Sequence, residues 1–142
     1  MIDKSYDLGR FIAAQKRDYQ TALAEIIQGR KRSHWMWYIF PQIRGLGMSS
    51  TSYFYGIENL EEARAFFNDP YLGKNLLEIS QALLRLDTNN ARAVMGSPDD
   101  LKLRSSMTLF SLAAPEEPVF KKVLEKYYGG AQDPETLRIL GI

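Results

Sequence analysis

The chain has 142 residues, of which 45% are hydrophobic and 25% charged, and its formal net charge is +1. This length and composition are those of one globular domain spanning residues 1–142, and the near-neutral charge excludes a strong electrostatic preference for duplex nucleic acid. With no cysteine and one histidine, the chain excludes disulfides, thiolate catalysis, cysteine-ligated zinc and a multi-histidine metal site, and we expect no metal or cofactor.

A helical period of apolar residues runs through the first part of the chain. Between Leu8 and Gln28 these residues recur at spacings of three and four, which predicts one amphipathic helix. We expect Asp7 to cap its start and Gly29 to supply the left-handed residue after its end. No segment approaches the ~20 apolar residues of a membrane span, and the N-terminus lacks the apolar centre of a signal peptide. We therefore expect a cytoplasmic protein with no membrane partner.

The next segment, "SHWMWYIFPQIRGLG", contains the only histidine and both tryptophans. Ser33 is a predicted N-cap, and Pro41 ends the short helix that follows it. Residues 42–52 then carry two glycines and four hydroxyl side chains, which is typical of a loop whose backbone adopts conformations that few other residues allow.

Five more helices are predicted from their start signals. Asn59 with Glu62 forms a capping box, and Pro70 suits the first turn of the helix after it. Similar residues mark three later starts: Ser97 with Pro98 and Asp100, Pro118, and Asp133 with Pro134. We find no strand pair, repeat or linker, so the sequence predicts an all-α fold, a single multihelical domain of six to seven short helices.

Four segments form a specific pattern: "KRSHWMWYIFPQIRGLGMS", "DPYLGKNLLE", "DDLKLRSSMTLF" and "VLEKYYGGAQDPETLRIL". In these segments the chain resembles a bacterial family of unknown function that genome annotation often labels calpastatin. The resemblance spans nearly the whole chain and implies a mainly α-helical single domain, but it implies no activity. A calpastatin-like inhibitor segment would be disordered and poor in aromatic residues, whereas 12% of this chain is aromatic. The composition of this chain is therefore not that of a calpastatin-like inhibitor, and we do not adopt that label.

The tryptophan segment is the first candidate site. On a helix, His34 and Trp37 share a face and Trp35 lies roughly opposite Trp37, so one indole can fill the core while the other faces a cleft. Imidazole is an acid or base near neutral pH, and indole stacks on planar ligands. The alternative is that His34 is a cap and both indoles are core. We expect the His34 ring to lie within hydrogen-bond reach of a side chain from residues 45–52 or 102–108.

Two other polar segments are candidates for the same pocket. In residues 44–52, the glycines let backbone amides approach a ligand, and Arg44 suits phosphate or carboxylate; the alternative is a turn and a helix cap. On the later helix, Lys102, Ser105 and Ser106 share one face, which indicates either a pocket wall or close helix packing.

The leading hypothesis is a cytoplasmic domain that binds a small anionic or nucleotide-like ligand. The predicted ligand-binding residues are Trp35, Trp37, Gln42, Arg44, Ser49, Lys102, Ser105 and Ser106. An alternative is a hydrolase acting on a nucleotide or ADP-ribose-type substrate with His34 as general acid or base. The family has a faint similarity to ADP-ribose-processing helical domains, from which no residue is carried over. A third hypothesis is a protein-interaction module, in which Tyr53, Phe54 and Tyr55 form an aromatic patch beside Arg30–Arg32. The sequence leaves the oligomeric state open.

Overall fold

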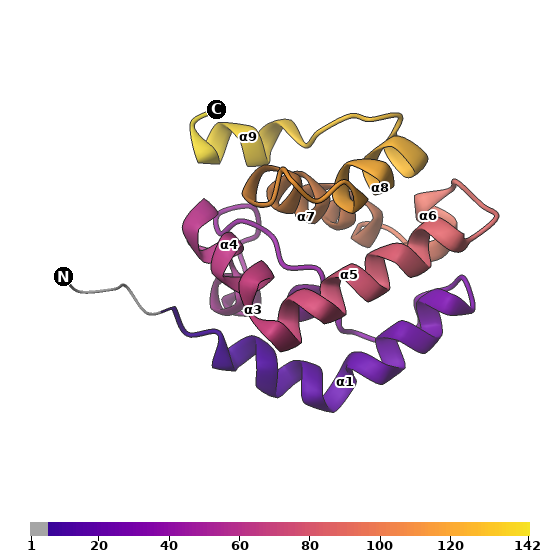
Figure 1. Ribbon diagram of the computed structural model, residues 1–142, viewed down its shortest axis with the longest axis horizontal. Coiled ribbons are helices and arrows are strands. Elements are labelled where there is room, and N and C mark those ends of the chain that lie inside the picture. The colour runs from indigo at the N-terminus through magenta and orange to yellow at the C-terminus, as the bar shows by residue number, and fades with distance from the viewer. Residues whose placement is uncertain (1–5) are drawn as a thin grey trace.

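Helices account for nearly all regular structure in the computed structural model, which describes residues 6–142 (Figure 1). Within these residues there are nine: α1 (Gly9–Ile27), α2 (Met36–Ile39), α3 (Ser50–Tyr55), α4 (Leu60–Asn68), α5 (Pro70–Arg85), α6 (Ala91–Met95), α7 (Asp99–Ala113), α8 (Val119–Tyr128) and α9 (Pro134–Leu140). The all-α prediction is confirmed, but the predicted number of six to seven is too low. The two unpredicted helices are α3 and α6, of six and five residues, which are too short to show a helical period.

The longer helices pack around one aromatic core. α5 lies against α1, α4 and α8, and α7 lies against α4, α6, α8 and α9. In Figure 1, α1 and α9 lie on opposite sides of the molecule, with α5, α7 and α8 between them. Ring contacts run from Phe11 to Phe66 (5.1 Å between centroids), from Phe66 to Phe110 (5.4 Å) and from Phe110 to Phe120 (5.8 Å). These contacts join α1, α4, α7 and α8, and such pairs add to the stabilisation that burial provides. No helix in residues 6–142 is both long and apolar enough to cross a membrane.

Several helix ends follow the local sequence signals. The Asn59 and Asp133 side chains cap α4 and α9, each accepting a hydrogen bond from the backbone three residues later. Pro70 is the first residue of α5, and Gly29 has the predicted left-handed backbone, with φ of 87°.

Three predicted N-caps, Asp7, Ser33 and Ser97, are wrong; α7 begins at Asp99, after Pro98, without a side-chain cap. α1 has no side-chain cap, and it is the backbone carbonyl of Asp7, not its carboxylate, that accepts a hydrogen bond from Arg10. α2 begins at Met36, later than predicted: the Ser33 hydroxyl donates to the Glu25 carboxylate at 2.6 Å and accepts no hydrogen bond from the first turn of a helix. For Ser33, a distant carboxylate competes with the cap.

One parallel bridge, between Ile43 and Ile57, closes the loop that contains α3. The Arg44 amide donates to the Ile57 carbonyl, and the Ile57 amide donates to the Gln42 carbonyl, both at 2.8 Å. Gly56 lies so close to this pair that a Cβ there would be 2.8 Å from the Arg44 Cβ. The bridge therefore fixes the positions of Gln42 and Arg44, which border two different cavities.

Candidate functional site

The two tryptophans occupy different environments. Trp35 is buried, and its indole nitrogen donates to the Glu25 carboxylate at 2.9 Å. Trp37 is only partly buried and borders a cleft. One indole therefore belongs to the core and the other faces a cavity, although Trp35 precedes α2 and does not share its helical spacing with Trp37.

Glu25 holds the segment before α2 in place. Its carboxylate accepts four hydrogen bonds, from the backbone amides of Arg32 and Ser33, the Ser33 hydroxyl and the Trp35 indole. Burial alone would raise the pKa of Glu25, but these hydrogen bonds outweigh it and lower the pKa to about 2. Trp35, predicted to bind ligand, thus has a structural role.

The expected contact of His34 is wrong. Its side chain is exposed, and its imidazole makes no hydrogen bond or ion pair with any residue of the described chain. The reason is that α2 begins only at Met36, so that His34 precedes the helix and does not share a helical face with Trp37. Only its backbone carbonyl is engaged, accepting from the Tyr38 hydroxyl at 3.2 Å.

Three of the predicted polar segments nevertheless meet at one cavity, of about 250 Å³, which we call the Trp37 cleft. It is lined by residues of α2, the following loop, α7 and α9: Trp37, Gln42, Leu46, Gly47, Pro98, Leu101, Lys102, Arg104, Ser105, Asp133 and Glu135. Four of the predicted ligand-binding residues, Trp37, Gln42, Lys102 and Ser105, lie together here.

Much of the charge in the Trp37 cleft is paired internally. The Lys102 ammonium lies 4.3 Å from the centre of the Trp37 ring and 3.2 Å from a carboxylate oxygen of Asp99. Asp133 accepts a hydrogen bond from Ser105 at 2.9 Å and lies 3.5 Å from the Arg104 guanidinium. Ser105 therefore attaches α9 to α7, which agrees with the alternative of close helix packing.

Two polar groups of the Trp37 cleft have no protein partner. Gln42 is only 8% exposed as a residue, and its side-chain amide makes no hydrogen bond with residues 6–142, but the polar atoms of this amide remain accessible to solvent at the cleft. The Nε of Arg104 is buried and likewise has no partner there. Buried polar groups are nearly always hydrogen-bonded, so the unpaired Arg104 Nε, together with the accessible Gln42 amide, marks the part of the cleft most suited to a polar ligand.

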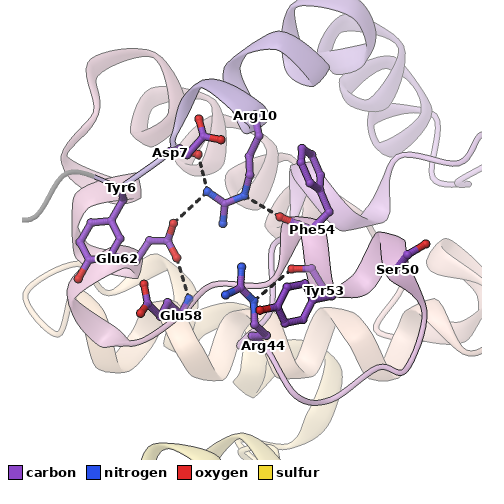
Figure 2. Close-up of a pocket in the computed structure, with 9 residues that line it drawn as sticks. All are labelled: Tyr6, Asp7, Arg10, Arg44, Ser50, Tyr53, Phe54, Glu58 and Glu62. Carbon is purple, nitrogen blue, oxygen red and sulfur yellow. Dashed lines mark hydrogen bonds and ion pairs between the residues drawn. The ribbon is translucent and has the colours of Figure 1, made fainter.

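The remaining predicted residues lie elsewhere. Arg44 borders a separate cavity of about 440 Å³, the Arg10–Arg44 pocket, shown in Figure 2. Ser49 caps α3 by accepting from the Ser52 amide at 3.0 Å. Ser106 is fully buried in α7, and its hydroxyl has no partner within the described chain. The single pocket predicted from sequence is therefore divided between two cavities and the core.

The aromatic run predicted as an interaction patch is also divided. Tyr53 and Phe54 are exposed, but Tyr55 is partly buried and packs on Phe11. Arg10 donates a hydrogen bond to the Phe54 carbonyl, and the Arg44 guanidinium lies 4.2 Å from the centre of the Tyr53 ring. Nothing in residues 6–142 joins the run to Arg30–Arg32 by a hydrogen bond, ion pair or cation–π contact, so the shared patch with that basic cluster stays a prediction.

A family model described as a protein of unknown function (DUF1810) matches residues 5–140. The chain belongs to this family. It is also similar to the crystal structure, at 1.38 Å, of the conserved hypothetical protein Rv1873 from Mycobacterium tuberculosis, with 44% sequence identity and a TM-score of 0.94. That match covers 96% of this chain and 98% of the other. No curated protein matches. The DUF1810 relationship confirms the predicted resemblance to an uncharacterised helical family and assigns no activity.

Within this DUF1810 chain, the two neighbouring serines of α7 should respond oppositely to substitution. Ser106→Ala is expected to leave stability unchanged or raise it by up to about 1 kcal/mol, because it removes a buried hydroxyl without a partner. Ser105→Ala is expected to lower stability by about 1–3 kcal/mol, because it removes the hydrogen bond to buried Asp133. Urea denaturation of the two variants checks both. A loss above about 1 kcal/mol in Ser106→Ala would show that this hydroxyl has a partner after all.

Proposed function

We propose that the protein binds a small planar ligand with an anionic group, such as a nucleotide-like molecule, in the Trp37 cleft. The observation that carries this proposal is the Gln42 amide, which is accessible at the cleft and has no hydrogen-bond partner within residues 6–142. The Nε of Arg104, which also lines the cleft, is a buried donor without a partner in the described residues.

The chemistry of these side chains defines the ligand. A glutamine amide presents an acceptor and a pair of donors in one plane, which matches the edge of a nucleobase or another planar amide. Lys102 directs one hydrogen bond at Asp99, and an ammonium carries three donors, so it retains capacity for an anionic group. A ring that stacks on the covered face of Trp37 would take the place of the Lys102 ammonium.

The size of the cleft limits the ligand further. Pockets that enclose a drug-sized molecule have volumes of about 300–1,000 Å³, whereas the Trp37 cleft has about 250 Å³. It therefore suits a single ring or a sugar with one anionic group better than a molecule as large as ADP-ribose. Because the His34 imidazole is exposed and lies outside the lining of the cleft, we propose no hydrolase mechanism that uses it.

Titration with adenine, adenosine monophosphate, ribose 5-phosphate and inorganic phosphate tests the proposal. At least one of the first three should change tryptophan fluorescence and raise the thermal midpoint, since ligand at 100 times its Kd stabilises a protein by about 2.7 kcal/mol. Gln42→Leu should weaken that binding by about tenfold or more, because the ligand loses a hydrogen-bond partner.

Gln20→Leu is the matched control, because Gln20 is an exposed glutamine of α1 and should leave binding unchanged. The proposal is wrong if none of these compounds produces a shift, or if Gln42→Leu binds them as well as the wild type does.

A further inference from the structure

Two arginines from distant parts of the chain border the same cavity, the Arg10–Arg44 pocket of about 440 Å³. Figure 2 shows Arg10, from α1, and Arg44, from the loop before α3, on opposite sides of the opening, with their guanidinium groups directed toward it. Tyr53 and Phe54 border the pocket on the α3 side. This pocket is separate from the Trp37 cleft and shares no lining residue with it.

Arg10 is a fixed part of the pocket wall. Its side chain is 6% exposed and pairs with Glu62 at 3.0 Å. Its other donors are directed at backbone carbonyls: Phe54 at 2.7 Å, Gly56 at 3.1 Å, and Asp7. In this way Arg10 joins α1, α3 and α4 at the wall of the pocket.

Arg44, by contrast, has donors to spare. Its Nε donates to the Tyr53 carbonyl at 3.1 Å, and its guanidinium lies 4.2 Å from the centre of the Tyr53 ring. Its two terminal nitrogens make no hydrogen bond, and no carboxylate pairs with it, within the described part of the chain. The stacked ring and the bound Nε fix the plane of the guanidinium, so its terminal N–H groups form a pair aimed into the pocket (Figure 2). Such a pair matches the two oxygens of a carboxylate.

The surroundings of Arg44 favour one class of ligand. Three carboxylates, those of Asp7, Glu58 and Glu62, border the same pocket, so a doubly charged phosphate would be repelled more strongly than a singly charged carboxylate. Tyr53 and Phe54 are 65% and 52% exposed, which leaves aromatic surface for an apolar group to cover. We propose that the Arg10–Arg44 pocket is a second ligand site, which binds the carboxylate of a small molecule with an aromatic or apolar body.

Titration of the full chain with 3-phenylpropanoate, 3-phenylpropan-1-ol and inorganic phosphate, followed by calorimetry and by NMR shifts, tests this assignment. The carboxylate should bind, and the alcohol and phosphate should bind about tenfold more weakly or not at all. Arg44→Gln should weaken carboxylate binding by about tenfold or more. Arg44→Lys should bind at an intermediate level, because an ammonium keeps the charge but loses the paired geometry. Arg92→Gln, at an exposed position of α6, is the matched control and should bind as the wild type does.

Three results would overturn the proposal: equal binding of the acid and the alcohol, phosphate binding as tight as carboxylate binding, or full affinity in both Arg44 variants. Arg44 is partly exposed, and circular dichroism establishes that the variants are folded. Should Arg44→Gln fail to fold, Arg44→Lys decides, since wild-type affinity in it contradicts the paired geometry. Gln42→Leu should not change phenylpropanoate binding, which separates this site from the Trp37 cleft.

Discussion

Glu25→Ala is expected to lower the free energy of unfolding by about 3–5 kcal/mol, a large fraction of the stability of a domain of this size. The carboxylate accepts hydrogen bonds from two backbone amides, the Ser33 hydroxyl and the Trp35 indole, and these donors are left without a partner when it is removed. Glu25→Gln retains one acceptor oxygen but places an amino group against the donors, so it should still lose about 2 kcal/mol or more.

The pH dependence of unfolding identifies the charge of Glu25 as the cause. The fold lowers its pKa from 4.5 to about 2, so its carboxylate contributes stability that is fully present above pH 4.5 and is lost as the pH falls toward 2. The difference in stability between wild type and Glu25→Gln should therefore shrink over that interval. Urea denaturation at several pH values measures it, with Glu125→Ala, at an exposed position of α8, as the control. A difference that does not change between pH 6 and pH 2.5 would contradict the assignment.

Glu25 also shows why part of the tryptophan segment was not predictable. Cap signals such as Asn59 and Asp133 were predicted correctly because cap and backbone amide are three residues apart. Ser33 carries the same local signal, but a buried carboxylate eight residues earlier offers its hydroxyl a stronger, charged partner. That competition is invisible in the local sequence, and it displaced the start of α2 and the direction of His34.

The candidate sites were predictable to a similar extent. Trp37, Gln42, Lys102 and Ser105 interrupt apolar segments, and such interruptions indicate that a polar surface lies beside the core, which is where the Trp37 cleft is. Arg10 gave no such signal, because a charge on an amphipathic helix is usually solvated. Its acceptors Phe54, Gly56 and Glu62 lie 44 to 52 residues away in the sequence, so only the packing of α1 against α3 and α4 reveals its role.

One loop serves both proposed sites. The bridge between Ile43 and Ile57 places Gln42 at the Trp37 cleft and Arg44 at the Arg10–Arg44 pocket. The glycines, serines and arginine of this segment suggested a single anion cradle, whereas the closed loop directs its side chains into two cavities. Whether a loop presents one surface or two depends on where its ends meet, and the sequence pattern alone does not contain that information.

Gly73→Ala is expected to destabilise the protein by about 2–3 kcal/mol or more, the reverse of the usual effect. Gly73 lies within α5, and replacing glycine by alanine at such a helical position ordinarily stabilises a protein by about 0.4–1 kcal/mol. Here a Cβ would lie only 2.0 Å from the carbonyl oxygen of Phe67, which belongs to α4. A backbone oxygen cannot rotate aside as a flexible side chain does, so α4 and α5 would have to separate.

The Gly73→Ala substitution tests the contact between α4 and α5. It does not test a general sensitivity of helical glycines. Gly9, at the first position of α1, is the matched control: a Cβ there would meet only the Asp7 carboxylate, at 3.4 Å, so Gly9→Ala should be neutral or slightly stabilising. Thermal and urea denaturation of both variants give the comparison. Since moving α4 also moves Glu62, which holds Arg10, Gly73→Ala should weaken 3-phenylpropanoate binding as well, whereas Gly9→Ala should not. A Gly73→Ala protein as stable as the wild type would show that α4 and α5 are not in such close contact.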